Sequence, residues 1–328
     1  MIFDELKIRI VDFTLRTDMD NVLPFLISSG QKTLERGVSN PKTGRQIVLR
    51  PHSMFKNPKP LSTPVNAAFT SGAGTLGAGT YYYRVAAIDI FGGVTLASTE
   101  TSLVLGATGG VNVNWTKVTD AVGYKVYGRS TGAELLIATA GDVSTYLDGG
   151  SITPAGALPV KNTTCLLLMD TNSIPVPSDY IELSYLGLKD GNTILPAMER
   201  YGSRKTGEIG INRATTNKAR PYTFDREENS FLLGSYADKD YTINMGYFRA
   251  LPALSSTNTT NWWSLNAEQA LLYAALVEAI PYLGDDPRGP VWFSKLIVEM
   301  EKLESEQNRE GFSGKRIRDI NTAPYLGS

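Results

Sequence analysis

Apolar residues in the last quarter of the chain recur at the spacing of one helix face. Leu272, Ala275, Leu276, Ala279 and Ile280 follow the i, i+3, i+4, i+7, i+8 pattern, which places them on one side of an α-helix. The pattern therefore predicts an amphipathic helix whose apolar side packs against the rest of the protein.

The flanking residues indicate where this helix starts and stops. Asn266 is expected to be its N-cap, with Gln269 completing a capping box, and Pro281 is expected to end it because proline lacks the N–H that a helix requires. A second helix is predicted to start near residues 286–290, and much of its surface within residues 295–310 is charged. Its apolar face consists of Phe293, Leu296, Ile297, Met300 and Leu303. The two helices form an αα-hairpin, a packing element rather than a catalytic one.

Residues 2–38 show the same pattern in two shorter segments. Their apolar faces consist of Phe3, Leu6, Ile10 and Phe13, then Val22, Leu23, Phe25, Leu26 and Leu34. Asp18 or Asp20 is expected to cap the second helix, and Gly37 to stop it. Pro24 falls in its first turn, where the missing N–H costs little. The sequence thus predicts an N-terminal helix pair.

The composition changes abruptly at about residue 61. Residues 61–160 contain only 10 charged residues but 16 of the 31 glycines. Short runs rich in Val, Tyr, Thr and Ile alternate there with glycine-rich turns, which is typical of a β-sandwich. We therefore expect residues 61–160 to form a separate all-β domain inserted into the rest of the chain.

The remaining residues read as a small sheet followed by the helical hairpin. Strands are expected at 165–170 and 179–188, and two or three antiparallel strands within 221–248. Residues 198–220 read as a basic loop. The predicted fold class is α+β, with domains at 1–60, 61–160 and 161–311 and an extended tail at 312–328.

Composition and charge exclude several functions. The net charge is −1 and the pI about 6.0, so no global positive field would hold duplex DNA. The single cysteine, Cys165, excludes an intrachain disulfide, and the single histidine, His52, excludes Ser-His-Asp and HExxH sites. We expect a solvated His52 in a proline-rich linker. No apolar run is long enough for a membrane helix, and the N-terminus lacks signal-peptide features.

The other short motifs carry little chemistry. Gly72, Gly74 and Gly77 match G-x-G-x-x-G, but they precede a predicted strand rather than a helix, so we expect a flexible loop and no dinucleotide. The acidic pairs at 18/20 and 285/286 sit at helix starts, where capping is favoured over metal binding. We therefore expect no catalytic residue, no cofactor and no metal.

The inserted segment resembles a fibronectin type III or immunoglobulin-like module. Trp115 stands where such modules bury a tryptophan, Tyr124 fits the facing strand, and TYLDGG at 145–150 looks like their later T-Y-x-D turn. The segment YYYRVAAIDIFGG at 81–93 resembles a strand near the end of the module, yet here it comes first. This order suggests a circularly permuted module, whose two ends lie close together.

The rest of the chain resembles the head-to-tail adaptor proteins of tailed bacteriophages. LRTDMDNVLPFLISSGQKTLER at 15–36 is similar to the opening of that family, and PSDYIE at 177–182 to its mid-chain motif. The strongest similarity runs from Tyr247 to Trp292, with LPALS, an N-x-T-N-W run, L-Y-x-A-L-x-E-A and an apolar-D-D turn in the family's order. LGSYA at 233–237 departs from it, since a proline is expected there.

This resemblance implies a structural virion protein, assembled in the cytoplasm of a bacterial host. About twelve copies would form a ring between the portal protein and the tail, nozzle or fibre proteins and continue the DNA channel. An alternative is a tail-associated binding module whose sandwich holds host-surface glycan or a neighbouring tail protein. An enzyme acting on glycan has little support without histidine or a clear acid pair.

Basic residues and the tail are the candidate contacts with the portal or with passing DNA. They are Arg200, Arg204, Lys205, Arg213, Lys218, Arg220, Phe312, Lys315, Arg316, Arg318 and Tyr325. DNA contact would involve phosphate only and weaken with salt; the alternative is a solvated loop. Trp262 and Trp263 are expected to anchor a helix start in the core rather than to form a binding platform.

Overall fold

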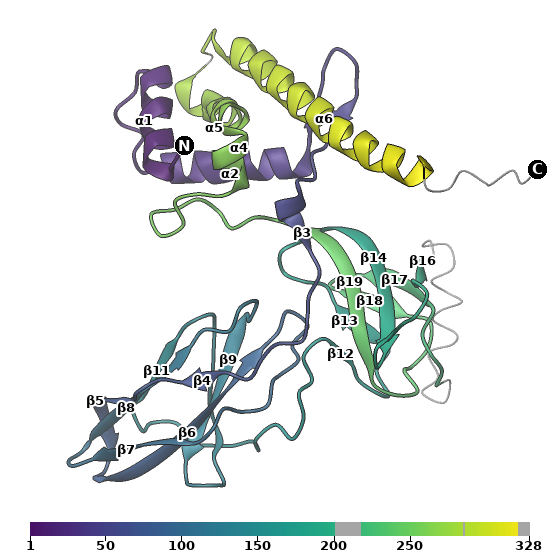
Figure 1. Cartoon of the computed structure of the whole chain (residues 1–328). Coiled ribbons are helices and arrows are strands. Elements are labelled where there is room, and N and C mark those ends of the chain that lie inside the picture. Colours follow the sequence, from purple (N-terminus) through teal and green to yellow (C-terminus); the bar gives the residue numbers. More distant parts are fainter. Residues whose placement is uncertain (201–217, 285, 321–328) are drawn as a thin grey trace, which may run out of the picture. The chain divides into compact units, whose positions relative to one another are not determined.

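A computed structural model describes residues 1–200, 218–284 and 286–320, with side chains as far as residue 309. The chain divides into two compact units, Met1–Lys56 with Phe248–Ser328, and Asn57–Tyr247. The described part of the first unit is mainly helical and that of the second is built from strands (Figure 1). The α+β class is therefore confirmed. The boundaries 61–160 of the insert stay a prediction.

The first unit, which we call the helical unit, is built around helix α5, Glu268–Leu283. Helices α1, α2, α4 and α6 all pack against α5 (Figure 1). The other helices are α1 (Phe3–Thr14), α2 (Leu23–Arg36), α4 (Trp262–Asn266) and α6 (Gly289–Ile320). The short elements are strands β1 (Val38–Ser39), β2 (Gln46–Ile47) and β3 (Phe55–Lys56), and the 3-10 turn η1 (His52–Met54).

Helices α2 and α5 approach each other so closely that one position admits only glycine. A Cβ atom added to Gly30 would lie 2.7 Å from the backbone nitrogen of Ala275 and 3.0 Å from the carbonyl carbon of Ala274. Small residues on both sides let the two backbones meet. The apolar stripe predicted on α5 faces this contact: Leu272, Ala275, Leu276 and Ala279 are buried, and Ile280 is half-buried.

The structure corrects the predicted ends of these helices. Asn266 does not cap α5: it is the last residue of α4, and α5 starts after Ala267 without a side-chain cap. The helix with a side-chain cap is α4, where Asn261 accepts from Ser264 N. Pro281 lies inside α5, two residues before its end, where the cost is one lost ladder bond. Helix α2 starts after Val22, without a side-chain cap, and Asp18 pairs with Arg16 at 2.7 Å instead.

Two predicted features of the N-terminal pair are confirmed. Pro24 occupies the first turn of α2, and Gly37 ends the helix with φ of 96°, a conformation that glycine adopts without steric cost.

The predicted extended tail is wrong for residues 312–320. Helix α6 continues through them to Ile320. Its glutamates lie mainly before Gly311 and its Lys315, Arg316 and Arg318 in the last turns, a charge order that complements the helix dipole. After Pro290 in its first turn, α6 contains no further proline, so its hydrogen-bond ladder meets no such obstacle as far as Ile320.

The second unit, which we call the strand unit, begins with two sheets that share one core. One sheet has the order β10-β9-β6-β7, and the other β11-β8-β4 with β5 also on β8. The strands are β4 (Val65–Asn66), β5 (Thr70–Leu76), β6 (Gly79–Ile88), β7 (Thr101–Leu105), β8 (Gly109–Thr116), β9 (Gly123–Arg129), β10 (Leu135–Ala140) and β11 (Thr145–Asp148). Tyr83, Val113 and Val126 belong to the buried cluster between them.

Two expectations about this region have clear outcomes. Trp115 is buried as expected, and its ring lies 5.1 Å from that of Tyr124 in the core. The glycine motif is not a flexible loop: Gly72 and Gly74 lie in strand β5. A Cβ at Gly74 would be 2.6 Å from Gly109 O, so the glycine permits a close backbone approach.

The rest of the strand unit forms a second pair of sheets around its own core. Their orders are β12-β19-β14-β15 and β13-β18-β17-β16. The strands are β12 (Leu166–Leu167), β13 (Ser173–Pro175), β14 (Tyr180–Asp190), β15 (Thr193–Ile194), β16 (Glu199–Arg200), β17 (Thr223–Glu227), β18 (Ser230–Leu233) and β19 (Tyr241–Arg249). Two or three strands were predicted within 221–248, and the structure has three there, β17, β18 and β19, of which β19 runs one residue further.

The two ends of the predicted insert lie next to each other. The backbone N–H of Leu61 donates to Thr164 Oγ1 at 3.0 Å, and Asn162 Nδ2 donates to Leu61 O at 3.0 Å. Buried Asp89, just after β6, also accepts from the backbone N–H groups of Gly93 and Cys165. This turn connects the first pair of sheets to the start of β12.

Replacing Gly30 with alanine tests the α2–α5 contact. Alanine normally stabilises a helix relative to glycine by roughly 0.5–1 kcal/mol, but here its methyl group meets backbone atoms. We expect Gly30→Ala to lower the unfolding free energy by about 1–3 kcal/mol in urea denaturation. Ser28→Ala on the same helix should stay within about 0.5 kcal/mol; a stabilised Gly30→Ala would contradict the close approach.

Candidate partner-binding site

Helix α6 is held along its charged side by the segment that follows α2. Asn40 Nδ2 donates to Glu301 Oε1 at 2.7 Å, and Arg45 Nη2 donates to Glu304 Oε1 at 2.5 Å. Asn40 is buried, so its amide has exchanged water for the carboxylate. Part of the charged face of α6 therefore makes specific contacts.

One helical turn further, the contact passes to the backbone. Gln307 Nε2 donates to Arg50 O at 3.0 Å, and Gln307 Oε1 accepts from Arg50 N at 3.3 Å. Glu301, Glu304 and Gln307 follow an i, i+3, i+6 spacing, which keeps them on one side of the helix. Residues 40–50 thus fix the position of α6 as far as Gln307.

A groove of about 690 Å³ opens beside this contact within the helical unit. Its walls come from the segment around η1, from the end of β19, and from α4 and α6. Its lining is Leu49, Arg50, Pro51, His52, Phe55, Phe248, Trp262, Asn266, Leu303, Glu306 and Gln307. We call this cavity the aromatic groove. Its size is typical of protein ligand sites.

Stacked rings form one wall of the aromatic groove. The rings of His52 and Phe55 are 6.2 Å apart and nearly parallel, and Phe55 meets Phe248 edge to face at 5.8 Å. The guanidinium of Arg50 lies 5.9 Å from the Phe248 ring centre. The predicted solvated His52 is exposed, but it lies in the short helix η1 and stacks on Phe55.

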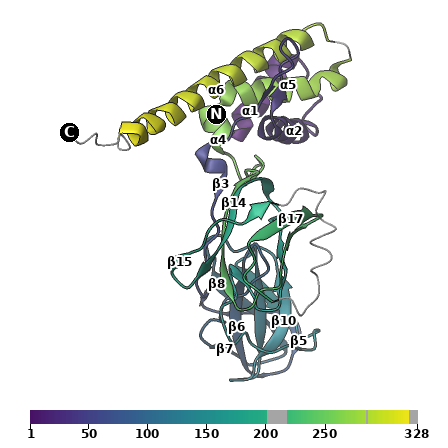
Figure 2. The same ribbon diagram turned by 90° about the vertical axis from the view of Figure 1, so that its right-hand side faces the viewer.

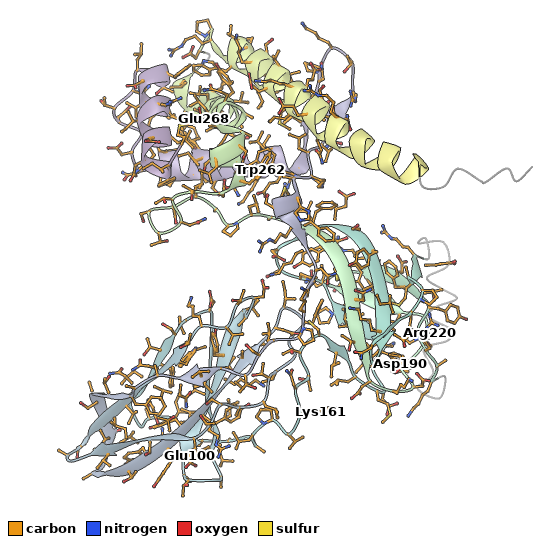
Figure 3. All side chains as sticks on the ribbon, viewed as in Figure 1. Glu100, Lys161, Asp190, Arg220, Trp262 and Glu268 are labelled. Carbon is orange, nitrogen blue, oxygen red and sulfur yellow. The ribbon has the colours of Figure 1, made fainter. Side chains whose placement is uncertain are left out.

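The two adjacent tryptophans have different roles. Trp263 is completely buried and meets Trp262 edge to face at 5.1 Å. The expected anchoring role thus fits Trp263. Trp262 is only half-buried and lines the aromatic groove (Figure 3).

A buried carboxyl group lies behind Arg50. Glu35 Oε1 accepts from Gln31 Nε2 at 2.9 Å and from Leu251 N at 3.1 Å, while Arg50 Nη1 donates to Glu35 O at 2.8 Å. Burial raises the pKa of Glu35 above its ordinary value of 4.5, and the donated hydrogen bonds oppose this rise only partly. The group links α2 to the chain entering α4.

The described basic candidates in the strand unit have three different surroundings. Arg200 is exposed at the end of β16, and Lys218 Nζ forms an ion pair with Asp170 at 2.6 Å. Arg220 is half-buried, and its Nε has no hydrogen-bond partner among the described residues (Figure 3). Their role as a partner contact stays a prediction.

The other candidates lie beyond what the structure describes. Arg204, Lys205, Arg213 and Tyr325 fall outside the described residues. Phe312, Lys315, Arg316 and Arg318 lie on α6, but their side chains are not among those described.

The second acidic pair supports capping only at Asp286, because residue 285 lies outside the described part. Asp286 Oδ1 accepts from Arg288 N at 2.9 Å, just before α6. The hydrogen bonds from the Arg288 side chain and backbone lower the pKa of Asp286 to about 2. Within the described ranges, no group of three or more His, Cys, Asp or Glu residues is arranged to hold a metal ion. None of the described helices is both long and apolar enough to span a membrane.

Comparison with known proteins points to one family. The model of the SU10 adaptor protein family matches residues 158–318. The match supports a phage adaptor family. No curated protein matches the chain. The matched segment contains β12 to β19 and helices α4 to α6, so the similarity to that family lies in the second half of the chain. Such a family is not an enzyme class.

The aromatic groove was not predicted from the sequence. Arg50 and Phe55 lie in a segment that reads as a proline-rich linker, and Phe248 ends a predicted strand. Phe55 and Phe248 share only their aromatic character, and Arg50 shares no signal with them. The glutamates on α6 did carry a signal, the three-residue spacing of Glu301 and Glu304 with Gln307, but many solvated helices show the same spacing.

The raised pKa of Glu35 predicts a pH effect on the helical unit. Between 4.5 and the raised value, the folded state binds more protons than the unfolded state, so this contribution to stability falls as pH rises. Glu35→Gln keeps the acceptor oxygen and removes the charge. We expect its unfolding free energy relative to the native chain to increase from pH 4 to pH 7 in denaturant titrations.

Glu306→Gln, at an exposed position of α6, serves as the control and should leave the pH profile unchanged. A Glu35→Gln profile parallel to that of the native chain would contradict the raised pKa of the buried carboxyl.

Proposed function

We propose that this protein is a ring-forming head-to-tail adaptor that links the portal of a tailed bacteriophage to tail or nozzle components and continues the DNA channel. The observation that carries the proposal is the match of the adaptor family model to residues 158–318. The ring, its size of about twelve copies and its docking to the portal go beyond that match and rest on the resemblance of the remaining motifs.

The helical unit has a form that suits this role. A ring built from head-to-tail contacts needs two different surfaces on each subunit. Helix α6 provides one, because its C-terminal part extends beyond the other helices of the unit (Figures 1 and 2). The hydrogen bonds between residues 40–50 and α6 end at Gln307. Residues 308–320 are therefore the projecting part of the helix.

The projecting part ends in a concentration of positive charge. Lys315, Arg316 and Arg318 fall within its last turns. A short basic segment of this kind suits an acidic protein surface or phosphate groups. We assign these three residues to portal docking, with nonspecific contact to passing DNA as a secondary role.

Reversing the three charges tests the docking. The variant Lys315→Glu, Arg316→Glu, Arg318→Glu should weaken portal binding at least tenfold in pull-down or interferometry assays, because attraction becomes repulsion. A matched control, Lys32→Glu, Lys295→Glu, Lys302→Glu, changes the net charge equally at three exposed positions and should bind normally. Electron micrographs of the native chain with portal should show rings of about twelve copies. A monomer that never joins portal would refute the proposal.

The role of the inserted sandwich is separate, since residues 61–157 lie outside the family match. We assign it to the outside of the ring as a bracing element. The adjacency of Leu61 and Thr164 allows excision of residues 61–160 with a short Gly-Ser linker. We expect the excised chain to dock to portal normally but to melt at lower temperature, because Cys165 N then loses its acceptor Asp89.

The excised chain also tests the alternative function. If the sandwich binds host glycan, particles carrying the excised adaptor should lose adsorption to host cells. Normal adsorption would exclude that function, and lost portal docking by a folded excised chain would place the sandwich in the assembly itself.

A further inference from the structure

We propose that the aromatic groove of one adaptor copy binds residues 321–328 of a second copy. This inference rests on the proposed ring and names a contact that joins its members. Three observations support it: the chemistry of the groove, the chemistry of the segment, and the distance between a groove and the segment of the same chain.

The groove offers flat apolar surfaces edged by hydrogen-bonding groups. Phe55, Phe248 and Trp262 supply the rings, and all three are only half-buried within the helical unit. Asn266 and Glu306 are exposed at the edge. A cavity of about 690 Å³ has the dimensions of a short peptide site. Aromatic-lined grooves of this type bind extended proline-containing peptides.

The segment after α6 has the matching composition. Residues 321–328 read NTAPYLGS and contain no charged side chain. Pro324 favours an extended backbone in the residue before it, and Tyr325 and Leu326 present apolar surface next to it. A proline, an aromatic ring and an aliphatic side chain in succession suit a wall of stacked rings, and Tyr325 also carries a hydroxyl for a polar edge.

Pro324, Tyr325 and Leu326 cannot lie together in the groove of their own chain. Residues 308–320 of α6 carry the start of the segment about 20 Å along the helix axis beyond Gln307, and about 26 Å beyond Leu303, at about 1.5 Å per residue. A fully extended chain takes Pro324 at most about 14 Å from Ile320, Tyr325 about 18 Å and Leu326 about 21 Å. Folded straight back, only Leu326 would come level with Gln307, at the near end of the groove lining. A groove that takes all three residues therefore belongs to a second copy.

A peptide-binding experiment tests this contact directly. A fluorescent peptide of residues 321–328 is titrated into the chain 1–320, which keeps every described residue, and anisotropy is recorded. We expect saturable binding in the micromolar range. Peptides with Tyr325→Ala or Leu326→Ala should bind at least tenfold more weakly.

Two groove variants complete the test. Trp262→Ala removes one wall, and Asn266→Trp fills the groove from an exposed position without removing core atoms. Each should reduce peptide affinity at least tenfold while circular dichroism shows an unchanged fold. If Trp262→Ala misfolds, Asn266→Trp decides alone. Absence of saturable binding, or equal binding to Asn266→Trp, would overturn the proposal.

A cross-linking experiment asks whether the contact joins two copies of the full chain. Glu306→Cys and Leu326→Cys chains are mixed under oxidising conditions; the native Cys165 is buried and does not compete. A disulfide-linked dimer is expected from the mixture. Lys302→Cys, an exposed α6 position outside the groove lining, should give none with Leu326→Cys. Equal dimer yields from both positions would contradict the contact.

The two proposals fail in different ways. Rings on portal without the Glu306–Leu326 cross-link would refute the groove contact and leave the adaptor function intact. Peptide binding by a chain that never joins portal would support the groove contact and refute the ring.

Discussion

The close approach of Gly30 to the backbone of Ala275 is the contact on which the helical unit depends. Interhelical distances are set by side-chain size, and the absence of a side chain here lets α2 lie directly against α5. Helices α1, α4 and α6 pack on the same central helix. Trp263, Leu26 and Leu276 become fully buried around it. A small change in this distance would therefore reach every helix of the unit.

The same packing places α6 where residues 40–50 can hold it. Charged helix faces usually remain solvated, but Glu301, Glu304 and Gln307 are satisfied by Asn40, Arg45 and the backbone of Arg50. Individually such pairs contribute little; in series they fix the direction of the helix. The projecting end and the aromatic groove are both consequences of that direction. They are the two surfaces of the helical unit on which the proposed contacts rest.

The strand unit has two separate cores and a junction of hydrogen bonds between them. Its two pairs of sheets have separate apolar clusters, one around Trp115 and Tyr124 and one around Phe231 and Tyr247. Between them, Asp89 accepts backbone hydrogen bonds and Leu61 meets Thr164. The family match begins at residue 158, next to this junction. The two cores are therefore packed separately and are joined through this junction.

Local pattern by itself determined the helices, most strands and the α+β class, because the periods of 3.6 and 2 follow from backbone geometry and place apolar residues such as Leu272 or Val113. Tertiary structure decided the rest. Asn266 ends α4 instead of capping α5. Gly72 and Gly74 lie in a strand because the neighbouring β8 supplies the hydrogen bonds. The aromatic groove joins Phe55, Phe248 and Trp262, residues distant in sequence, so only the folded chain brings their rings together.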